Sequence, residues 1–533
     1  MQRLFVYTFF FLLTVGSSVA QSIDVQHYSF SLVLSDTTDR IEGIAMITVK
    51  SMQATDHISL DLTDVNKRGK GMMVHGVHAN AAINRFEQKN EKLHIWFRQN
   101  IKANETLLIS VQYSGIPVDG LIISKNKYGE RTFFADNWPN RAHHWIPCND
   151  RPDDKASFEF YVAVPHSFQV ISNGVLQKDT ALNEWTKKAL QRGKYFHWKE
   201  TIPLPTKIMV IGVARFAIKE YEHKPSGIPV SAWVYPQDSS KGFYDYGLAP
   251  EILDFFSRYI APYPYKKLAN VQSKTIFGGM ENASAIFYSE TSVTGDRRSE
   301  DLLAHEIAHQ WFGNMASEKT FTHLWLSEGF ATYLTNVFLQ SKYGPGIMKK
   351  RMEEDREQVI EFARKNKRAV VDSTSSYMEL LNANSYQKGG WILHMLRKET
   401  GDSSFHRILK EYYEQYKGGN ADTRDFEAIA EKVSGKELTW FFNQWLYRPG
   451  LPSLVIQKKI VPAGVQIIVM QTQKDVFQLS LPIEIKTKDG KSKKTDFAIT
   501  GRAHSFLVSK DKNAIITVDP DAELLFEEVK RGR

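Results

Sequence analysis

Cysteine is nearly absent from this chain. Cys148 is the single cysteine among 533 residues, so no disulfide can form within the chain. Exported animal proteins of this size usually contain disulfides, because their compartments are oxidising. If the chain is exported, its cysteine content therefore favours a bacterial protein of the periplasm or of the extracellular medium.

Long apolar runs are missing after the first 20 residues, whereas a membrane-spanning helix needs about 20 apolar residues. Residues 1–20 combine the charge of Arg3, an apolar run over 5–15 and the small residues Ser18-Val19-Ala20. This order is typical of a secretory signal peptide, and its apolar run is too short for a stable membrane anchor. We expect an exported chain, periplasmic or secreted, and the sequence does not choose between the two.

The chain also lacks a block of lysine and arginine, an internal repeat and a low-complexity tract. Its formal net charge of +8 is modest for this length, so we expect no nucleic-acid partner. A hydrophobic content of 42% is typical of a globular protein, and 533 residues are too many for one hydrophobic core. We therefore expect several domains; the sequence does not indicate an oligomeric state.

Three regions differ in their residue patterns. Residues 21–217 contain short runs rich in Val, Ile, Phe and Tyr between turns, which predicts mainly antiparallel sheets. Residues 218–449 show mostly helical periodicity. After the break at Pro449-Gly450-Leu451-Pro452, strand-length runs over 450–533 predict a small β-sandwich. The predicted fold class is multidomain α+β.

The most specific chemical pattern is His305-Glu306-Ile307-Ala308-His309, in a helical run over 300–311. Residues i and i+4 share a helix face, so both imidazoles can bind one metal ion, and Glu306 can act as a general base. Glu328, nineteen residues further on in a helix expected over 324–339, would be the third ligand. Two His and one Glu leave a position for water, which is typical of catalytic Zn²⁺. We expect one Zn²⁺ per chain, although cobalt or manganese can replace it in vitro. A short match of this kind also arises by chance, and the spaced Glu makes that less credible.

Two further segments contribute candidate residues. In Phe277-Gly278-Gly279-Met280-Glu281-Asn282, the paired glycines permit close approach of another backbone. A peptide bound there as an extra strand would place its free amino group against Glu281; the alternative is a tight turn with a solvated Glu. Tyr386 opens another helical segment, and its hydroxyl can donate a hydrogen bond to an oxyanion. Taken alone, such a Tyr is more often a packing residue.

These segments, in this order, resemble the zinc aminopeptidase family that includes aminopeptidase N and leukotriene hydrolase, of the gluzincin clan. Trp145-Ile146-Pro147-Cys148-Asn149-Asp150-Arg151-Pro152 is similar to a Pro-Cys-x-Asp-x-Pro segment of that family. The resemblance covers residues 25–450. It implies a saddle-like N-terminal β-sheet domain, a thermolysin-like catalytic domain and a C-terminal β-sandwich, with Cys148 as a buried small hydrophobic residue.

The resemblance also implies a role for each motif residue in releasing the first residue of a peptide with a free N-terminus. The zinc ligands would be His305, His309 and Glu328; the general base Glu306; the oxyanion donor Tyr386; the amine anchor Glu281; and the substrate strand Gly278, Gly279 and Met280.

The sequence departs from the family at two places. Many relatives carry a helical fourth domain after the β-sandwich, whereas this sequence ends at Arg533, so we expect a more open cleft and no epoxide hydrolase activity. In the family a polar residue eleven positions before the Pro of the Pro-Cys segment reaches the pocket for the first side chain. Here that position is Asp136. Its carboxylate would favour Arg or Lys substrates, help Glu281 hold the amine, or only cap a turn.

Two other functions compete with an aminopeptidase. A thermolysin-like endopeptidase has the same zinc site, but an anchor such as Glu281 selects chain ends. A catalytically inactive binding scaffold of the same fold is the second, and the six intact catalytic positions argue against it.

Overall fold

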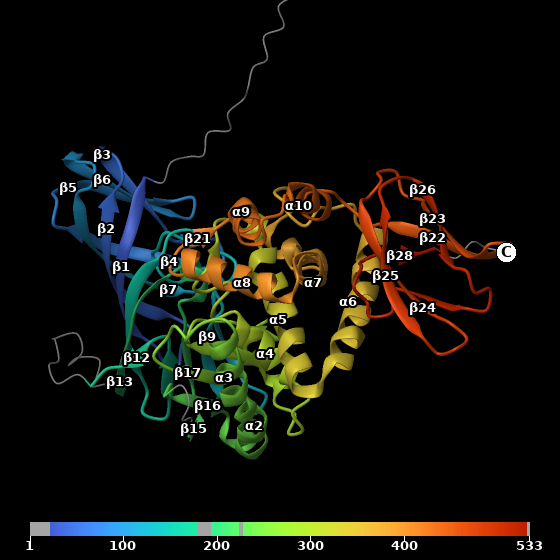
Figure 1. Cartoon of the computed structure of the whole chain (residues 1–533). Coiled ribbons are helices and arrows are strands. Elements are labelled where there is room, and N and C mark those ends of the chain that lie inside the picture. Colours follow the sequence, from blue (N-terminus) through green and yellow to red (C-terminus); the bar gives the residue numbers. More distant parts are fainter. Residues whose placement is uncertain (1–21, 179–192, 223–226, 530–533) are drawn as a thin grey trace, which may run out of the picture.

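The computed structural model describes residues 22–178, 193–222 and 227–529. Figure 1 shows blue N-terminal strands on one side, a central block of helices, and the red C-terminal strands on the other side. The predicted signal peptide lies outside the described residues. No helix in the described part of the chain combines the length and the apolar character that crossing a membrane requires.

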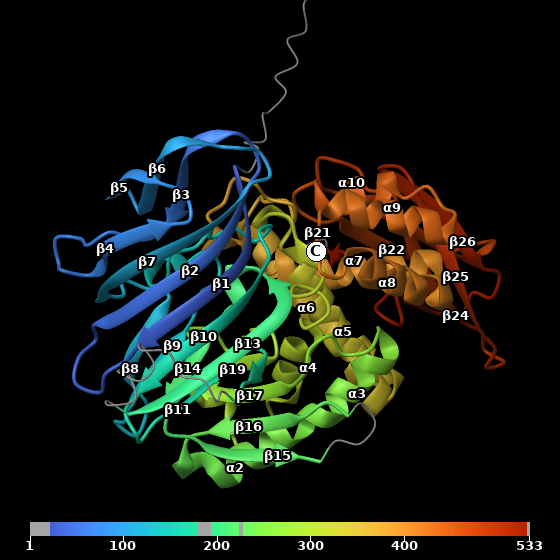
Figure 2. The same cartoon turned by 90° about the vertical axis from the view of Figure 1, so that its left-hand side faces the viewer.

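The N-terminal region is built on a seven-stranded sheet that curves across Figure 2. Apolar and polar residues alternate along its strands. In β1, Tyr28, Phe30 and Leu32 are buried on one face, and the serines between them are half-buried. Neighbouring strands are antiparallel except β1 and β10, which are parallel. In spatial order the strands are β12 (Val175–Leu176), β13 (Lys194–Leu204), β10 (Ala156–Val164), β1 (Ile23–Val33), β2 (Ile41–Ser51), β7 (Thr106–Ile116) and β4 (Gly71–Ala79).

Two smaller sheets complete this region. A four-stranded sheet has the order β11 (Gln169–Ser172), β14 (Ile211–Ala214), β9 (Arg131–Ala135) and β8 (Leu121–Lys125). A three-stranded sheet has the order β3 (Thr55–Asp61), β6 (Lys92–Ile101) and β5 (Ile83–Lys89). Cys148 is fully buried, as expected.

The middle region opens with a five-stranded sheet, although the prediction from residue 218 onward is mostly helical. Its order is β15 (Ala217–Tyr221), β16 (Val230–Val234), β17 (Leu268–Ser273), β19 (Ala285–Ser289) and β18 (Gly279–Met280). Every residue of β17 is buried, so this strand shows none of the polar alternation that reveals a half-exposed strand. The short edge strand β18 carries the paired-glycine segment.

Helices follow, and most agree with the predicted helical periodicity. The first metal-motif helix, α4, ends at Ala308 instead of continuing to residue 311, and His309 is its C-terminal cap. The segment around Tyr386 is a π-helix, Asn384–Lys388, in place of the predicted α-helix. Among the described residues, the α-helices are α2 (Ser239–Asp245), α3 (Ala249–Tyr259), α4 (Glu300–Ala308), α5 (Trp325–Tyr343), α6 (Pro345–Lys365), α7 (Gly389–Thr400), α8 (Asp402–Tyr416), α9 (Thr423–Ser434) and α10 (Thr439–Leu446).

The C-terminal region consists of two sheets that pack together, as predicted for a sandwich. Phe497 of one sheet contacts Phe506 of the other, with ring centroids 4.8 Å apart. Long helix α6 lies beside this region (Figure 1), where Arg364 forms an ion pair of 2.5 Å with Glu527. The two sheets have the orders β26 (Ala503–Ser509), β23 (Gly464–Gln471), β22 (Ser453–Val461), β28 (Glu527–Glu528), and β25 (Ser492–Ile499), β24 (Leu479–Lys486), β27 (Ile515–Val518).

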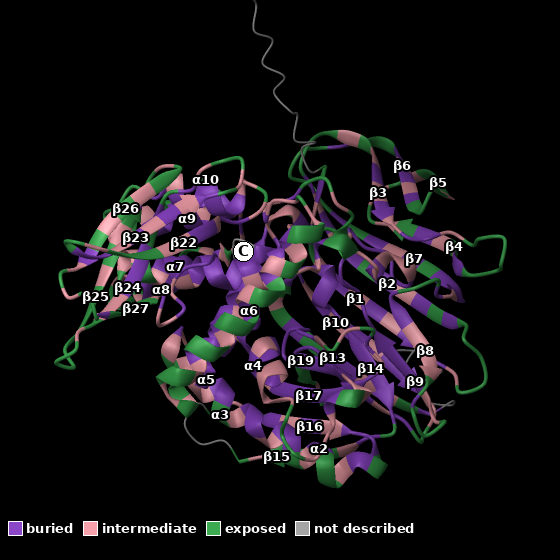
Figure 3. Ribbon diagram, turned by 90° about the vertical axis from the view of Figure 1, so that its right-hand side faces the viewer, coloured by how far each residue is buried: buried purple, intermediate pink, exposed green. Residues whose placement is uncertain are grey.

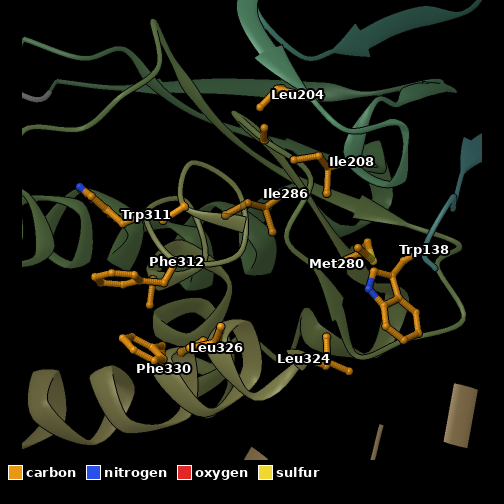
Figure 4. Close-up of a cluster of buried hydrophobic side chains, with 14 of the residues drawn as sticks. Trp138, Leu204, Ile208, Met280, Ile286, Trp311, Phe312, Leu324, Leu326 and Phe330 are labelled. Carbon is orange, nitrogen blue, oxygen red and sulfur yellow. The ribbon is translucent and has the colours of Figure 1, made fainter. Parts of the chain in front are cut away.

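Buried side chains form a core that continues between the regions. Figure 3 colours the buried residues of each region purple. In the close-up of Figure 4, Trp138 of the N-terminal region lies beside Met280 of the middle region. A buried ion pair between Lys207 and Glu318 also joins the two regions. The predicted multidomain α+β class is confirmed, and the exact domain boundaries stay a prediction.

Candidate active site

His305, His309 and Glu328 converge at one point between α4 and α5. The Nε2 atoms of the two histidines are 3.0 Å apart, and each lies 3.2 Å from Oε2 of Glu328. Side chains one helical turn apart share a face, so α4 and its cap direct both rings to α5. These distances are close to those between the ligands of a tetrahedral Zn²⁺, whose bonds to N and O are about 2.0–2.2 Å long. The donor set therefore fits a zinc ion.

Contacts behind the cluster orient His309. Its Nδ1 atom lies 3.1 Å from the carbonyl oxygen of Phe312 and 3.1 Å from Oγ of Ser327. An Nδ1–H that donates to Phe312 leaves the lone pair of Nε2 directed into the cluster, as a metal ligand requires.

The cluster has a strongly negative environment. Burial alone would lower the pKa of His309, but Glu328, Glu281 and Glu306 outweigh it and raise that pKa to about 10. Burial favours the protonated form of Glu328, yet the His309 and His305 side chains hold its pKa below the usual range. Three carboxylates around two imidazoles thus favour a cation at this point.

Glu306 is buried on the same helix, and its carboxylate lies against Gly279 of β18. Burial raises the pKa of its carboxyl group, and the negative charges of Glu281 and Glu328 add to that effect. A Cβ atom on Gly279 would lie 2.3 Å from Oε1 of Glu306, so the two residues are in close contact.

Glu281 follows directly after β18 and is 5% exposed. Its backbone carbonyl accepts hydrogen bonds from Gln310 Nε2 at 2.8 Å and from Asn314 Nδ2 at 2.7 Å. Burial raises the pKa of its side chain, and His309 opposes this. Gln310 and Asn314, which follow the metal motif, therefore hold the Glu281 backbone in place. The buried Glu281 carboxylate can accept a cationic partner.

Tyr386 lies over the cluster, with its ring nearly parallel to that of His305 at 5.9 Å. Burial and the three neighbouring carboxylates raise the pKa of its hydroxyl, which is therefore protonated near neutral pH. Two glycines allow the start of α7 to lie close to α5. A Cβ on Gly389 would lie 2.9 Å from the Cα of Gly329 in α5. The π-helix and α7 thus pack closely against the helix that carries Glu328.

A pocket of about 510 Å³ lies next to the cluster, and the motif residues line it together. Gly278, Gly279, Met280 and Glu281 line it, as the predicted roles require. The sequence did not predict the other residues that line the pocket. They belong to no motif and resemble ordinary packing or surface positions. The additional lining residues include Trp138, Phe277, Asp301, Leu302, Arg351, Glu354, Asp355 and Gln358.

The walls of the pocket differ in character. Trp138 makes edge-to-face contacts with Phe277 at 5.9 Å and with Phe321 at 5.6 Å, which gives an aromatic wall beside the Glu281 segment. Helix α6 contributes a charged wall, on which burial raises the pKa of Asp355 to about 6.

The expectation that Asp136 lines the pocket is wrong. Its side chain is fully buried, and Arg141 donates to Oδ1 at 2.7 Å. The other oxygen accepts from Thr275 Oγ1 at 3.0 Å and from the backbone N–H of Ile276 at 2.9 Å. Through these three hydrogen bonds, the carboxylate supports the segment leading to Gly278 from behind. Asp136 is not among the residues that line the pocket.

Comparison with known families agrees with this geometry. The model of the peptidase M1 N-terminal domain matches residues 24–208, and that of the peptidase family M1 domain matches residues 244–445. The chain belongs to peptidase family M1. The resemblance found from the motifs is thereby confirmed, whereas the individual residue roles remain predictions.

Several M1 relatives carry names of aminopeptidases. "Probable aminopeptidase 1" of Sulfurisphaera tokodaii is 26% identical over 459 residues, which are 81% of this chain and 54% of that protein. "Aminopeptidase M1-C" of Oryza sativa is 28% identical over 60% of this chain and 37% of its own length. "Glutamyl aminopeptidase" of Rattus norvegicus is 25% identical over 81% and 48%. The chain thus spans about half, or less, of the length of these relatives.

Proposed function

We propose that this M1 chain is a zinc-dependent aminopeptidase that hydrolyses the first peptide bond of substrates with a free N-terminus. The observation that carries the proposal is the position of the buried Glu281 carboxylate, in the same pocket as the His305–His309–Glu328 cluster. A metal cluster alone suits any zinc peptidase, whereas a carboxylate beside it selects the charged end of a chain.

His305, His309 and Glu328 would hold the zinc ion, which supplies Lewis-acid polarisation of water and of the scissile carbonyl. Its positive charge would also oppose the effect of burial on Glu306 and Glu281 and favour their ionised forms. The ionised Glu281 accepts hydrogen bonds from the ammonium group of the first residue.

The remaining steps belong to side chains of this protein. Glu306 accepts the proton of the attacking water and then delivers it to the nitrogen of the leaving peptide. The Tyr386 hydroxyl donates a hydrogen bond to the oxyanion of the tetrahedral intermediate. The narrow space between Gly279 and Glu306 keeps the base close to the strand on which a substrate would lie.

An assay of Leu- and Arg-p-nitroanilides, their N-acetylated forms and an end-blocked peptide tests this proposal, with and without a chelator. We expect metal-dependent release from the free forms only, and Glu281→Ala should reduce the preference for a free amine. Cleavage of the end-blocked peptide would identify an endopeptidase instead. A zinc-loaded protein that cleaves none of these substrates would be an inactive scaffold.

We also propose that the chain is exported to the periplasm or the medium, which residues 1–20 support by their signal-peptide pattern. Fractionation of expressing bacteria, with N-terminal sequencing of the accumulated protein, tests this. A cytoplasmic protein that retains Met1 would contradict it.

A further inference from the structure

A second group of potential metal ligands lies in the N-terminal region, outside the residues that line the active-site pocket. It consists of Glu91, His143 and His144, whose ligand atoms all lie within 4.8 Å of one another. Glu91 is at the tip of the hairpin between β5 and β6, which Figure 2 shows at the outer edge of the N-terminal sheets. The two histidines end a 3₁₀ turn, Ala142–His144. Glu91 and His143 also line a surface cleft of about 510 Å³.

Each histidine is held through its Nδ1 atom. That atom of His143 lies 2.7 Å from Oδ2 of Asp150, and that of His144 lies 2.7 Å from Oγ1 of Thr63. No described residue forms a hydrogen bond with the Nε2 atom of either ring, so these atoms can serve as ligands. This is the arrangement of a metal-binding histidine, whose second nitrogen donates to a carboxylate or another oxygen. The active-site His309 shows it too, with Phe312 as its acceptor.

The hairpin tip is fixed to the same part of the molecule. The backbone N–H of Glu91 donates to Oδ1 of Asp64 at 2.9 Å, and its carbonyl accepts from the N–H of Leu62 at 2.9 Å. Thr63, between those two residues, donates its N–H to the carbonyl of His143 at 2.9 Å. The segment 62–64 therefore fixes both the Glu91 backbone and the histidine turn, and the two parts face each other without needing a metal to bring them together.

The Glu91 side chain has an unusual position. Glu91 has φ of 59° in a two-residue hairpin turn, a left-handed conformation in which glycine is favoured. Yet its carboxylate takes part in no hydrogen bond or ion pair with any residue of 22–178, 193–222 or 227–529. The site thus offers one unused carboxylate and two oriented imidazoles.

The surrounding charges favour a cation. Asp61 and Asp150 lie beside the histidine turn, and Lys92 is paired with Asp61 at 2.5 Å. With Glu91 and Asp64, four carboxylates face Lys92 and Arg151 around the two imidazoles. Two His nitrogens and one carboxylate oxygen are ligands that suit zinc better than magnesium or calcium, which prefer oxygen alone.

We propose that Glu91, His143 and His144 bind a second Zn²⁺, which fastens the β5–β6 hairpin to the turn that precedes Trp145. This ion is separate from the one proposed for catalysis and rests on other residues. Asp150 and Thr63 act as positioning residues that orient the two rings.

Equilibrium dialysis of the metal-stripped protein against micromolar Zn²⁺ at pH 8, followed by elemental analysis, tests the proposal. We expect two equivalents in the wild-type protein and one in Glu91→Gln and in His144→Ala. His166→Ala, which removes an exposed histidine of the same region, should retain two. Asp150→Asn should weaken the second site by about 10-fold or more and leave the first unchanged.

His309→Ala separates this proposal from that for the active site. It should retain one equivalent, and the double variant Glu91→Gln/His309→Ala should retain none. If His309→Ala binds as much zinc as wild type while Glu91→Gln loses one equivalent, the catalytic assignment fails and this one stands. A single equivalent in wild type, abolished by His309→Ala, would overturn the second site. Two equivalents retained in Glu91→Gln would also overturn it, and Glu91→Gln is a conservative change at a surface turn that should not disturb folding.

Discussion

A Cβ atom on Gly279 would lie 2.3 Å from Oε1 of Glu306 and 2.5 Å from its Cδ. Real side chains do not approach so closely, so β18 and the predicted base on α4 fit together only because residue 279 is glycine. The position of the Glu306 carboxylate in the metal motif therefore depends on the paired-glycine segment, although the two segments are far apart in the sequence.

Gly279→Ala should displace the Glu306 carboxylate and lower kcat strongly. A misplacement of about 1 Å in a catalytic group costs about 10²-fold. Zinc content should remain that of the wild type, because no ligand changes, and Glu306→Gln should give the same pattern with a larger loss. Measured kcat and bound zinc for both variants check this.

Gly278→Ala is the matched control. Its added methyl group would have Leu302 Cδ1 at 3.9 Å as its nearest neighbour, which is an ordinary contact. It should retain most of the activity. Equal losses in the two alanine variants would show that the strand needs glycine for its own backbone and not for Glu306.

Tyr386→Phe should lower kcat by about 10²-fold and leave KM nearly unchanged, as for the loss of one oxyanion donor. The ring still packs against His305, so the zinc site should survive. Tyr244→Phe, at an exposed position of α2, serves as the control. A raised KM with an unchanged kcat would make Tyr386 a substrate-binding residue.

Asp136→Ala should affect all substrates alike, because its carboxylate contacts Arg141, Thr275 and Ile276 behind the pocket. The variant leaves the N–H of Ile276 and the hydroxyl of Thr275 without their acceptor, which costs about 1–3 kcal/mol for each buried group, so it should also unfold at a lower temperature. Values of kcat/KM for Arg, Lys, Ala and Leu substrates, with a thermal melt, check both effects. A loss confined to Arg and Lys would restore the specificity role expected from the sequence.

The case of Asp136 shows what sequence could and could not predict here. Local spacing placed His305 and His309 on one face, and the order of the motifs added Glu328, Glu281 and Tyr386, all of which the fold brings to one pocket. Counting residues placed Asp136 in the right segment but could not tell which way its side chain points. The direction depends on Arg141 and on the distant residue Thr275.

One structural element and one wall of the pocket were missed for a similar reason. Strand β17 is buried throughout, so it lacks the alternation by which half-exposed strands are predicted. Helix α6 has a charged face that resembles a solvent-exposed one, although Arg351 and Glu354 line the pocket. Both depend on what packs against the segment, which the local pattern does not contain.

Asp154 should make the stability of the N-terminal region depend on pH. Burial raises the pKa of its carboxyl group to about 7 from an ordinary value of 3.8. The folded protein therefore keeps a proton between pH 4 and 7 that the unfolded chain has released, and its stability falls as the pH rises through that range. The largest slope for one such group is about 1.4 kcal/mol per pH unit. Asp154→Asn cannot ionise and should lose this contribution to the pH dependence.

Asp154 accepts hydrogen bonds from the backbone N–H of Val25 and from Asn149 Nδ2, so the Asn variant should be less stable at pH 4, where one of these donors meets an amide N–H₂. That deficit should shrink or reverse as the pH approaches 7, because only the wild type then bears the cost of a buried charge. Melting temperatures at several pH values between 4 and 8 measure the difference. Asp36→Asn, which alters an exposed carboxylate of the same region, should follow the wild-type profile. Parallel profiles for the wild type and Asp154→Asn would mean that Asp154 is already ionised in the folded protein at pH 4, and that its hydrogen bonds outweigh its burial.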